Sequence, residues 1–166
     1  MAPGTATGAA GTWILLAYRL PREPSTPRIA LWRKLRRLGV AQVGDGLVAL
    51  PADARTREQL EWLADEVVEA DGQASVWLAR PGSVAQERAL AAQMATAIAA
   101  DYRAVADDAG EAARAELAVR RRTGARLRRE LRRIAARDYF PPAERDRAQA
   151  AVAELAATLT AEEVGG

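Results

Sequence analysis

The residues best suited to chemistry in this sequence are cationic side chains that gather on one short predicted helix. Residues 27–38 contain five basic residues and no acidic one. At roughly 100° per residue, three leucines of this helix fall on one side and the basic residues spread over the opposite arc. Such an arc can bind successive phosphates of a nucleic acid, whereas a face that only meets water usually mixes both signs of charge. The residues that we expect to contact nucleic acid here are Arg33, Lys34, Arg36 and Arg37, with Arg19 and Arg22 from the segment before the helix.

A second cationic segment, residues 111–137, holds ten basic and three acidic residues, which is a local net charge of +7. All ten are arginines, and a guanidinium group can bind an oxyanion through two parallel hydrogen bonds. Arg122, Arg129 and Arg133 are the members that we expect to add nucleic-acid contacts. The alternative is a helical hairpin that packs on another protein, with arginines that only face solvent.

One arginine of this segment falls on the apolar side of its predicted helix. Aliphatic residues from Leu117 to Ile134 follow heptad spacing, and the same seam includes Arg120. A charge in an apolar seam needs a partner. If the chain turns near Gly110, an antiparallel helix pair sets Asp101 and Tyr102 opposite residues 119–120. We therefore predict a partly buried Asp101–Arg120 ion pair that fixes the register of the hairpin.

The residue types exclude several classes of enzyme. The chain contains no cysteine and no histidine, so disulfides, thiol or imidazole catalysis and zinc sites built on those residues are excluded. It has no phosphate-binding Gly-rich loop, no Gly-x-Ser-x-Gly turn and no metal-ligand spacing. The carboxylates between residues 58 and 69 follow a helix surface that we expect to face solvent. We therefore expect no catalytic residue, no metal and no cofactor, and a protein that is not an enzyme.

The elements that position these side chains predict an α+β domain over residues 13–80. Strands are expected at 13–19, 40–43, 47–50 and 74–78, and helices at 27–38 and from 56 to about 70. Thr26 and Thr56 are expected to cap the two helices, and Gly39 suits the left-handed end of the first. Asp45-Gly46 favours a hairpin turn. The order β-α-β-β-α-β is that of a ferredoxin-like fold, with both helices on one face of a four-stranded antiparallel sheet.

Residues 81–160 predict a helical subdomain that begins after Pro81-Gly82. Helices are expected at 84–107, 111–137 and 143–159, an α-helical hairpin plus a short third helix that can cover the other face of the sheet. Residues 1–12 are expected to form a disordered tail, and residues 161–166 a flexible one. No run approaches the ~18 apolar residues of a transmembrane helix, and the N-terminus lacks the features of a signal peptide. We therefore expect a cytoplasmic protein that does not bind membranes.

Several motifs from Trp13 onward point to one family. They are WILLAYRLPREPS, RIALWRKLRRLG, DGLVALP and WLADEV, followed more loosely by the Arg-rich helix and its stop at Asp138-Tyr139-Phe140-Pro141. With these motifs the chain resembles the N-terminal domain of ChrB, the chromate-resistance regulatory protein. The resemblance implies a transcriptional regulator or accessory factor of a chromate-efflux system, with DNA as partner and a response to chromate or another oxyanion. Regulators of this kind continue into a C-terminal domain linked to that response, whereas this sequence ends at Gly166, which speaks against chromate sensing by this chain.

The β-α-β-β-α-β unit is more distantly similar to the middle domain of the PaaX-type repressors and to the small ferredoxin-like endonucleases of CRISPR adaptation. Those endonucleases carry a metal-binding aspartate at the end of the first strand, where this sequence has Tyr18-Arg19-Leu20. Without that ligand, metal-assisted hydrolysis is not expected. The similarity also implies a homodimer that forms through sheet edges.

We interpret the chain as a regulator that binds DNA through Arg-rich surfaces. The first rival is a protein–protein interaction module without nucleic-acid binding, and the second is a metal-dependent nuclease. The main interpretation requires the basic residues of the first turn and the first helix to form one open cationic surface.

Overall fold

The structure of the chain is a computed structural model that describes residues 11–164, with side chains described as far as residue 161. The disordered tail predicted for 1–12 and the end of the tail predicted for 161–166 lie outside the described residues. The chain divides into two compact units, Met1–Met94 and Ala95–Gly166. Compact units need not fold independently, so the domain boundary predicted at residues 80–81 stays a prediction.

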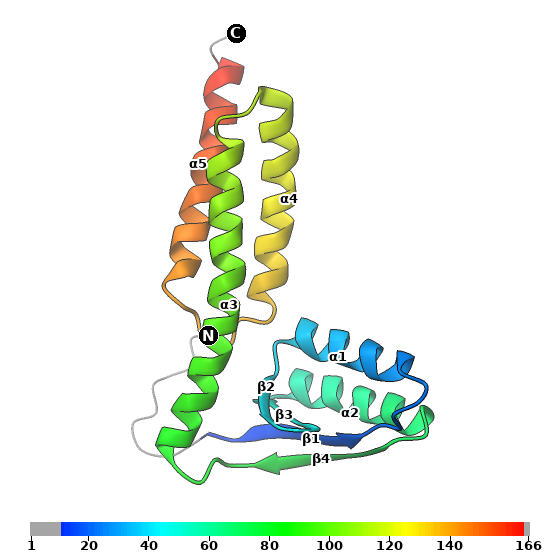
Figure 1. The fold of residues 1–166 in the computed structure, drawn as a ribbon. Coiled ribbons are helices and arrows are strands. Elements are labelled where there is room, and N and C mark those ends of the chain that lie inside the picture. The colour runs from blue at the N-terminus through cyan, green and yellow to red at the C-terminus, as the bar shows by residue number, and fades with distance from the viewer. Residues whose placement is uncertain (1–10, 165–166) are drawn as a thin grey trace. The chain divides into compact units, whose positions relative to one another are not determined.

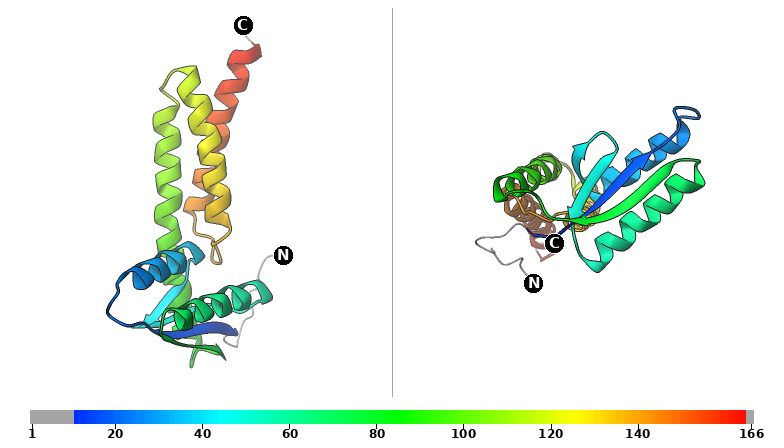
Figure 2. Two further views of the ribbon diagram at one scale, coloured as in Figure 1. Left: turned by 90° about the vertical axis from the view of Figure 1, so that its right-hand side faces the viewer. Right: turned by 90° about the horizontal axis from the view of Figure 1, so that it is seen from below.

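The first unit is built on a four-stranded antiparallel sheet with the strand order β2-β3-β1-β4. Its strands are β1 (Trp13–Arg19), β2 (Ala41–Gly44), β3 (Leu47–Pro51) and β4 (Gln73–Ala79), and its helices are α1 (Thr26–Leu38) and α2 (Ala54–Glu69). Both helices lie on the same side of the sheet (Figure 1 and Figure 2). This order and arrangement confirm the ferredoxin-like prediction.

The core of the first unit follows from the alternation of β1. Ile14 and Leu16 point toward the helices and are fully buried, as are Val48 and Leu50 of the neighbouring strand β3. Helix α1 adds Leu31 and Leu35 to this core, and helix α2 adds Leu60, Leu63 and Val67. The basic arc of α1 is therefore held outward by the burial of the opposite side of the same helix.

The ends of α1 and α2 differ from the predictions at their first turns. Helix α1 begins at Thr26 after Ser25, and no side-chain oxygen caps it. Helix α2 begins at Ala54, and its cap is Asp53, whose carboxylate accepts a hydrogen bond from the Thr56 backbone N–H at 2.7 Å. Thr56 is thus the N3 residue of that capping box, and its hydroxyl accepts a hydrogen bond from the Asp53 backbone N–H at 2.9 Å. The predicted C-terminal exit of α1 is confirmed, because Gly39 has φ of 73°.

The other face of the sheet meets the start of α3 (Val84–Ala112). The indole N–H of Trp13 donates to Glu87 at 2.8 Å. The backbone N–H of Gln42 donates to the side chain of Gln93 at 2.7 Å, and the Gln93 amide returns a bond to the Gln42 carbonyl at 3.2 Å. Trp77 of β4 nevertheless remains 60% exposed.

The second unit consists of the rest of α3 with α4 (Leu117–Ala135) and α5 (Glu144–Val164). Its core is a cluster of buried small, aliphatic and aromatic residues from all three helices: Ile98, Tyr102, Val105, Ala109, Ala112, Leu127, Ile134, Ala148, Val152 and Leu155. Of the described residues, none belongs to a helix that is long and apolar enough to span a membrane.

Two helix boundaries of the second unit were predicted wrongly. Helix α3 continues through Asp108-Ala109-Gly110 to Ala112, because Ala109 is buried in the helical core and a single glycine costs a helix only about 1 kcal/mol. The turn to α4 therefore lies later than expected. Helix α5 continues to Val164, past the predicted end near Leu159, because no glycine or proline intervenes.

Candidate nucleic-acid interface

Three arginines of α1 form the cationic surface that the sequence predicts on this helix. Arg33, Arg36 and Arg37 are exposed, and no carboxylate in the described part of the chain lies within salt-bridge distance of them. We call this set the α1 cationic face. Lys34 differs from the three, because its ammonium group forms an ion pair with Glu66 of α2. Three of the four predicted α1 cations therefore remain available to an external anion.

Trp32 lies beside the α1 cationic face and is 55% exposed. The guanidinium carbon of Arg36 lies 4.9 Å from the centre of the indole ring, a cation–π contact. A shallow hollow is lined by this part of the helix, namely Ala30, Trp32, Arg33, Lys34, Arg36 and Arg37. The cationic face thus includes an aromatic surface as well as charge.

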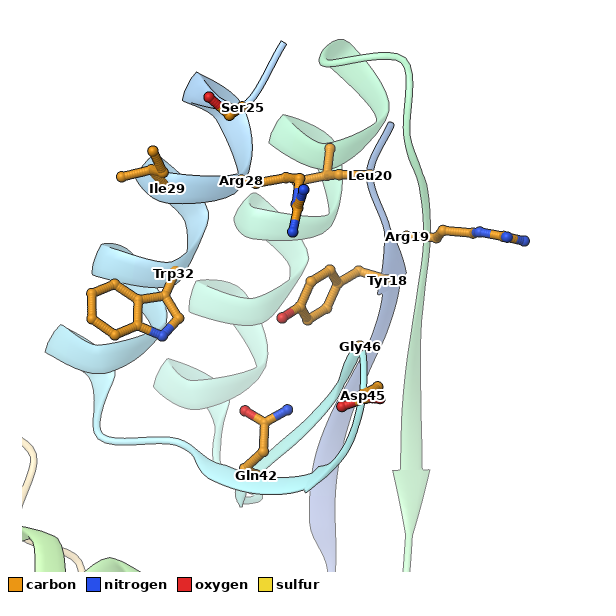
Figure 3. Close-up of a pocket in the computed structure, with 10 residues that line it drawn as sticks. All are labelled: Tyr18, Arg19, Leu20, Ser25, Arg28, Ile29, Trp32, Gln42, Asp45 and Gly46. Atoms are coloured by element: carbon orange, nitrogen blue, oxygen red, sulfur yellow. The ribbon is translucent and has the colours of Figure 1, made fainter. Parts of the chain in front are cut away.

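A larger hollow, which we call the Trp32 groove, lies on the other side of the same tryptophan. It encloses about 980 Å³ and is lined by Tyr18, Arg19, Leu20, Ser25, Arg28, Ile29, Trp32, Gln42, Asp45 and Gly46. Figure 3 shows Tyr18, Arg28 and Gln42 directed into one space from β1, α1 and β2. Burial raises the pKa of the Tyr18 hydroxyl above its ordinary value.

The structure does not place Arg19 on the α1 cationic face. Successive residues of β1 point to opposite sides of the sheet, and Tyr18 points toward the helices. Although Arg19 is among the residues that line the groove, its side chain points away from α1, as Figure 3 shows. Arg22 is exposed in the connection between β1 and α1. The prediction of one surface formed by the first turn and the helix together is wrong for Arg19, for the simple reason of strand alternation.

The arginines of α4 lie on the outer side of that helix. Its inner side is buried through Gly124, Leu127 and Ile134. Arg122, Arg129 and Arg133 are exposed, as the sequence predicts. Arg133 lies 3.5 Å from Glu130, and a further arginine of the helix, Arg126, donates to Asp108 at 2.7 Å. This surface is therefore partly neutralised by carboxylates of its own unit.

The predicted Asp101–Arg120 ion pair is replaced by another pair. Asp101 accepts a hydrogen bond from Arg137 at 2.8 Å, and the neighbouring Tyr102 donates to Asp138 at 2.8 Å. Because α3 runs on past Gly110, residues of α3 face residues that come later in the chain than a turn at Gly110 implies. Arg120 instead lies in the first turn of α4. The predicted Asp101–Arg120 pair is therefore wrong, and the arginine that pairs with Asp101 is Arg137, which lies just beyond the end of α4.

Tyr102 is the most polar member of the helical core. Burial raises the pKa of its hydroxyl, and its hydrogen bond to the Asp138 carboxylate raises it further. The side chain is 1% exposed, so its hydroxyl needs the partner that Asp138 supplies. This contact stabilises the helical unit, and it is no part of a binding surface.

Sequence reasoning missed the Trp32 groove. Tyr18 was counted as a strand residue, and Gln42 as part of a short strand beside a turn. Two signals in the sequence indicate the groove residues Tyr18 and Trp32. Tyr18 shares the helix-facing side of β1 with Ile14 and Leu16, and Trp32 falls near the edge of the apolar side of α1.

Comparison with known proteins agrees with the motifs. The family model described as "Protein ChrB, N-terminal" matches residues 28–163, which include α1 from Arg28 onward, α3, α4 and all but the last residue of α5. The chain belongs to the ChrB N-terminal family. A relative, Protein ChrB of Cupriavidus metallidurans, is 36% identical over 66 residues, which are 40% of this chain and 20% of that protein. This ChrB N-terminal chain therefore spans about a fifth of that relative. No solved structure matches it.

Proposed function

We propose that this ChrB N-terminal chain binds nucleic acid through α1, as part of a transcriptional regulator or accessory factor of chromate resistance. The observation that carries the proposal is the α1 cationic face, three exposed arginines on one helix without a described carboxylate beside them. Most hydrogen bonds between proteins and DNA go to phosphate and sugar, and arginine is a principal donor. The exposed arginines of α4, Arg122 and Arg129, supply secondary phosphate contacts.

Salt dependence measures this mode of binding directly. Each neutralised phosphate adds roughly 0.9 to the slope of log affinity against log salt concentration, because counterions are released. If a duplex contacts Arg33, Arg36 and Arg37, the slope should therefore become shallower by about 2.7 when all three arginines are changed to glutamine. An interaction module that binds protein only has little DNA affinity at any salt concentration.

The experiment is a salt titration of duplex binding by fluorescence anisotropy. The variant is Arg33→Gln/Arg36→Gln/Arg37→Gln, and its matched control is Arg80→Gln/Arg88→Gln/Arg114→Gln, which removes the same charge from exposed positions outside α1 that form no ion pair with a described carboxylate. We expect the slope to fall by about 2.7 in the α1 variant and far less in the control. Equal losses in both variants, or no affinity of the unmodified chain at low salt, would contradict the proposal.

A protein-binding role is the second candidate, and one observation favours it. Strand β4 pairs only with β1 among the described strands, and its Trp77 and Leu78 are 60% and 57% exposed. An exposed edge with large apolar groups can pair with a second copy of the chain. Sedimentation of the wild type and of Trp77→Lys measures this, and a monomer at all concentrations argues against the dimer.

We further propose that the chain acts without catalysis. The end of β1 offers Tyr18 and Arg19 where a nuclease of this fold needs an acidic ligand, and within residues 11–161 no three carboxylates lie together in a way that could hold a metal ion. Incubation with single- and double-stranded DNA and Mg²⁺ or Mn²⁺ tests the point. Intact substrate is the expected result, and cleavage overturns this part of the proposal.

A further inference from the structure

The Trp32 groove holds two features that DNA backbone binding does not explain. Its α1 wall carries Ile29 and Trp32, which are 48% and 55% exposed and stand three residues apart on one side of the helix. Large apolar side chains gathered in one exposed hollow mark a surface that meets a partner. Because one of them is an indole, a planar ring is the group best suited to cover the wall.

Two polar groups of the groove, the Arg28 guanidinium and the Tyr18 hydroxyl, have no ion-pair or hydrogen-bond partner among the described residues. Gln42 donates its side-chain amide to the Gly44 carbonyl at 2.6 Å, which leaves its carbonyl oxygen toward the hollow. Asp45 lies at the end of the groove remote from Arg28 (Figure 3). The groove therefore offers a cation at one end and acceptors at the other.

We propose that the Trp32 groove binds a nucleotide, with the base against Trp32 and Ile29 and the phosphate at Arg28. The ring covers the apolar wall, and the acceptors of Gln42 and Asp45 match the exocyclic amino group that adenine, cytosine and guanine carry. A purely apolar ligand would form no contact with the charges of Arg28 and Asp45. An inorganic anion leaves the indole wall uncovered.

The link to the α1 cationic face makes a nucleic-acid strand one source of this nucleotide, and this link rests on the proposed function. Trp32 lines both the groove and the hollow of the α1 cationic face. A strand whose phosphates lie along that face can therefore turn an unpaired base over Trp32 into the groove. Bases in an intact duplex are stacked and paired, so the groove accepts only an unpaired one. A free nucleotide is the other source, with the same chemistry.

The test compares four ligands: a short adenine-rich single strand, a blunt duplex, dAMP, and TMP, whose base lacks the amino group. The variants are Trp32→Ala and Arg28→Gln. The matched controls are Trp62→Ala, which removes an equally exposed tryptophan of α2 that lines neither hollow, and Arg88→Gln. Stacking of one base on an aromatic side chain contributes about 1–3 kcal/mol, so we expect roughly a 5- to 150-fold loss of single-strand affinity in Trp32→Ala. The Trp62→Ala control should stay within about twofold.

The ligands distinguish a nucleic-acid strand from a free nucleotide as the source of the bound base. They also distinguish the nucleotide site from the proposed duplex binding through α1. Preference for the single strand over the duplex, lost in both groove variants, assigns the groove to an unpaired base. Binding of dAMP better than TMP, lost in the same variants without a single-strand preference, assigns it to a free nucleotide.

Unchanged affinity of Trp32→Ala and Arg28→Gln for every ligand overturns the inference, even where neutralising Arg33, Arg36 and Arg37 abolishes duplex binding. Conversely, dAMP binding at the groove without any duplex affinity contradicts only the proposed function. Circular dichroism checks that each variant is folded, and Tyr18→Phe provides a second, milder probe of the groove.

Discussion

Helices α1 and α4 are both rich in arginine, but the residues around their arginines differ. Helix α1 has four exposed arginines, namely Arg28 and the three of the α1 cationic face, together with an exposed tryptophan and a hollow on each side of that tryptophan. Helix α4 has more arginines, but two of them, Arg126 and Arg133, lie beside carboxylates. Its large apolar groups, Leu127 and Ile134, are turned inward and fully buried.

The two helices therefore differ in their surroundings more than in their density of positive charge. The charge on α4 follows from an amphipathic helix that needs a polar outer side to keep a packed inner side. On α1, the leucine side is buried in the same way, yet Ile29 and Trp32 stay exposed among the cations. Exposed apolar groups bring no gain to a folded chain alone, so their position beside the arginines favours α1 as the specific contact.

The largest expected effect concerns the core beneath α4. Leu127→Ala removes a fully buried side chain and should lower the free energy of unfolding of the helical unit by about 2–5 kcal/mol. Nucleic-acid binding through α1 should persist, because the buried side of α1 packs within the first unit. Thermal denaturation followed by circular dichroism, with binding measured below the transition, checks both. The exposed neighbour Arg128 provides the control, and Arg128→Ala should change stability by less than about 0.5 kcal/mol.

The next effect concerns the polar contact in that core. Tyr102→Phe removes a hydrogen bond to a carboxylate and should cost about 1–2 kcal/mol. The raised pKa of Tyr102 sets the pH dependence. The folded state keeps the phenol proton at a higher pH than the unfolded state, so this stabilisation is complete below about pH 10 and is lost as pH rises above that value. Denaturant unfolding at pH 8 and at pH 11 measures it. The gap between wild type and variant should narrow at pH 11, and a gap that widens refutes the assignment.

A smaller effect tests α4 as a nucleic-acid contact. Arg122→Gln/Arg129→Gln removes two exposed arginines that no described carboxylate neutralises. We expect duplex affinity to fall by no more than about tenfold, equally for single and double strands, since phosphate contacts carry no sequence or base information. Anisotropy at one fixed salt concentration measures the change beside Arg33→Gln/Arg36→Gln. If the α4 variant loses more affinity than the α1 variant, the roles assigned to the two helices are reversed.

The smallest effect concerns Lys34, the α1 cation that forms an ion pair with a described carboxylate. Lys34→Gln breaks an exposed ion pair with Glu66, which should cost less than about 1 kcal/mol of stability. DNA affinity should change less than in Arg33→Gln, because Lys34 is already neutralised in the free protein. Side-by-side titration of the two single variants makes the comparison. A larger loss in Lys34→Gln than in Arg33→Gln would show that DNA displaces Glu66.

Local chemistry accounts for what could be predicted of the fold. The apolar run of Trp13–Arg19, the proline-rich turn, the glycine at 39 and the Asp45-Gly46 pair each act over a few residues, so strand and helix positions follow closely from them. Errors arose where a local signal competed with packing in the core. Gly110 indicates a break, while burial of its neighbour Ala109 continues α3, and only packing decides between them.

The candidate site was predicted in part for the same reason. Periodicity along α1 places Arg33, Arg36 and Arg37 on one arc without reference to the rest of the chain. The pairing of Lys34 with Glu66, the turning of Arg19 to the far side of the sheet and the exchange of Arg120 for Arg137 beside Asp101 depend on residues distant in sequence. Sequence spacing holds no information on those distances.

The amino-acid sequence by itself determined the order of strands and helices, the outward charge of α1 and α4 and the family of the chain. Tertiary structure alone decided which cations keep their charge unpartnered, and it brought Tyr18, Arg28, Trp32 and Gln42 around one groove. The physical reason is range. Hydrophobic periodicity and backbone preferences act within a few residues, whereas a charge pair or a pocket needs chain segments that only the folded sheet and its helices bring together.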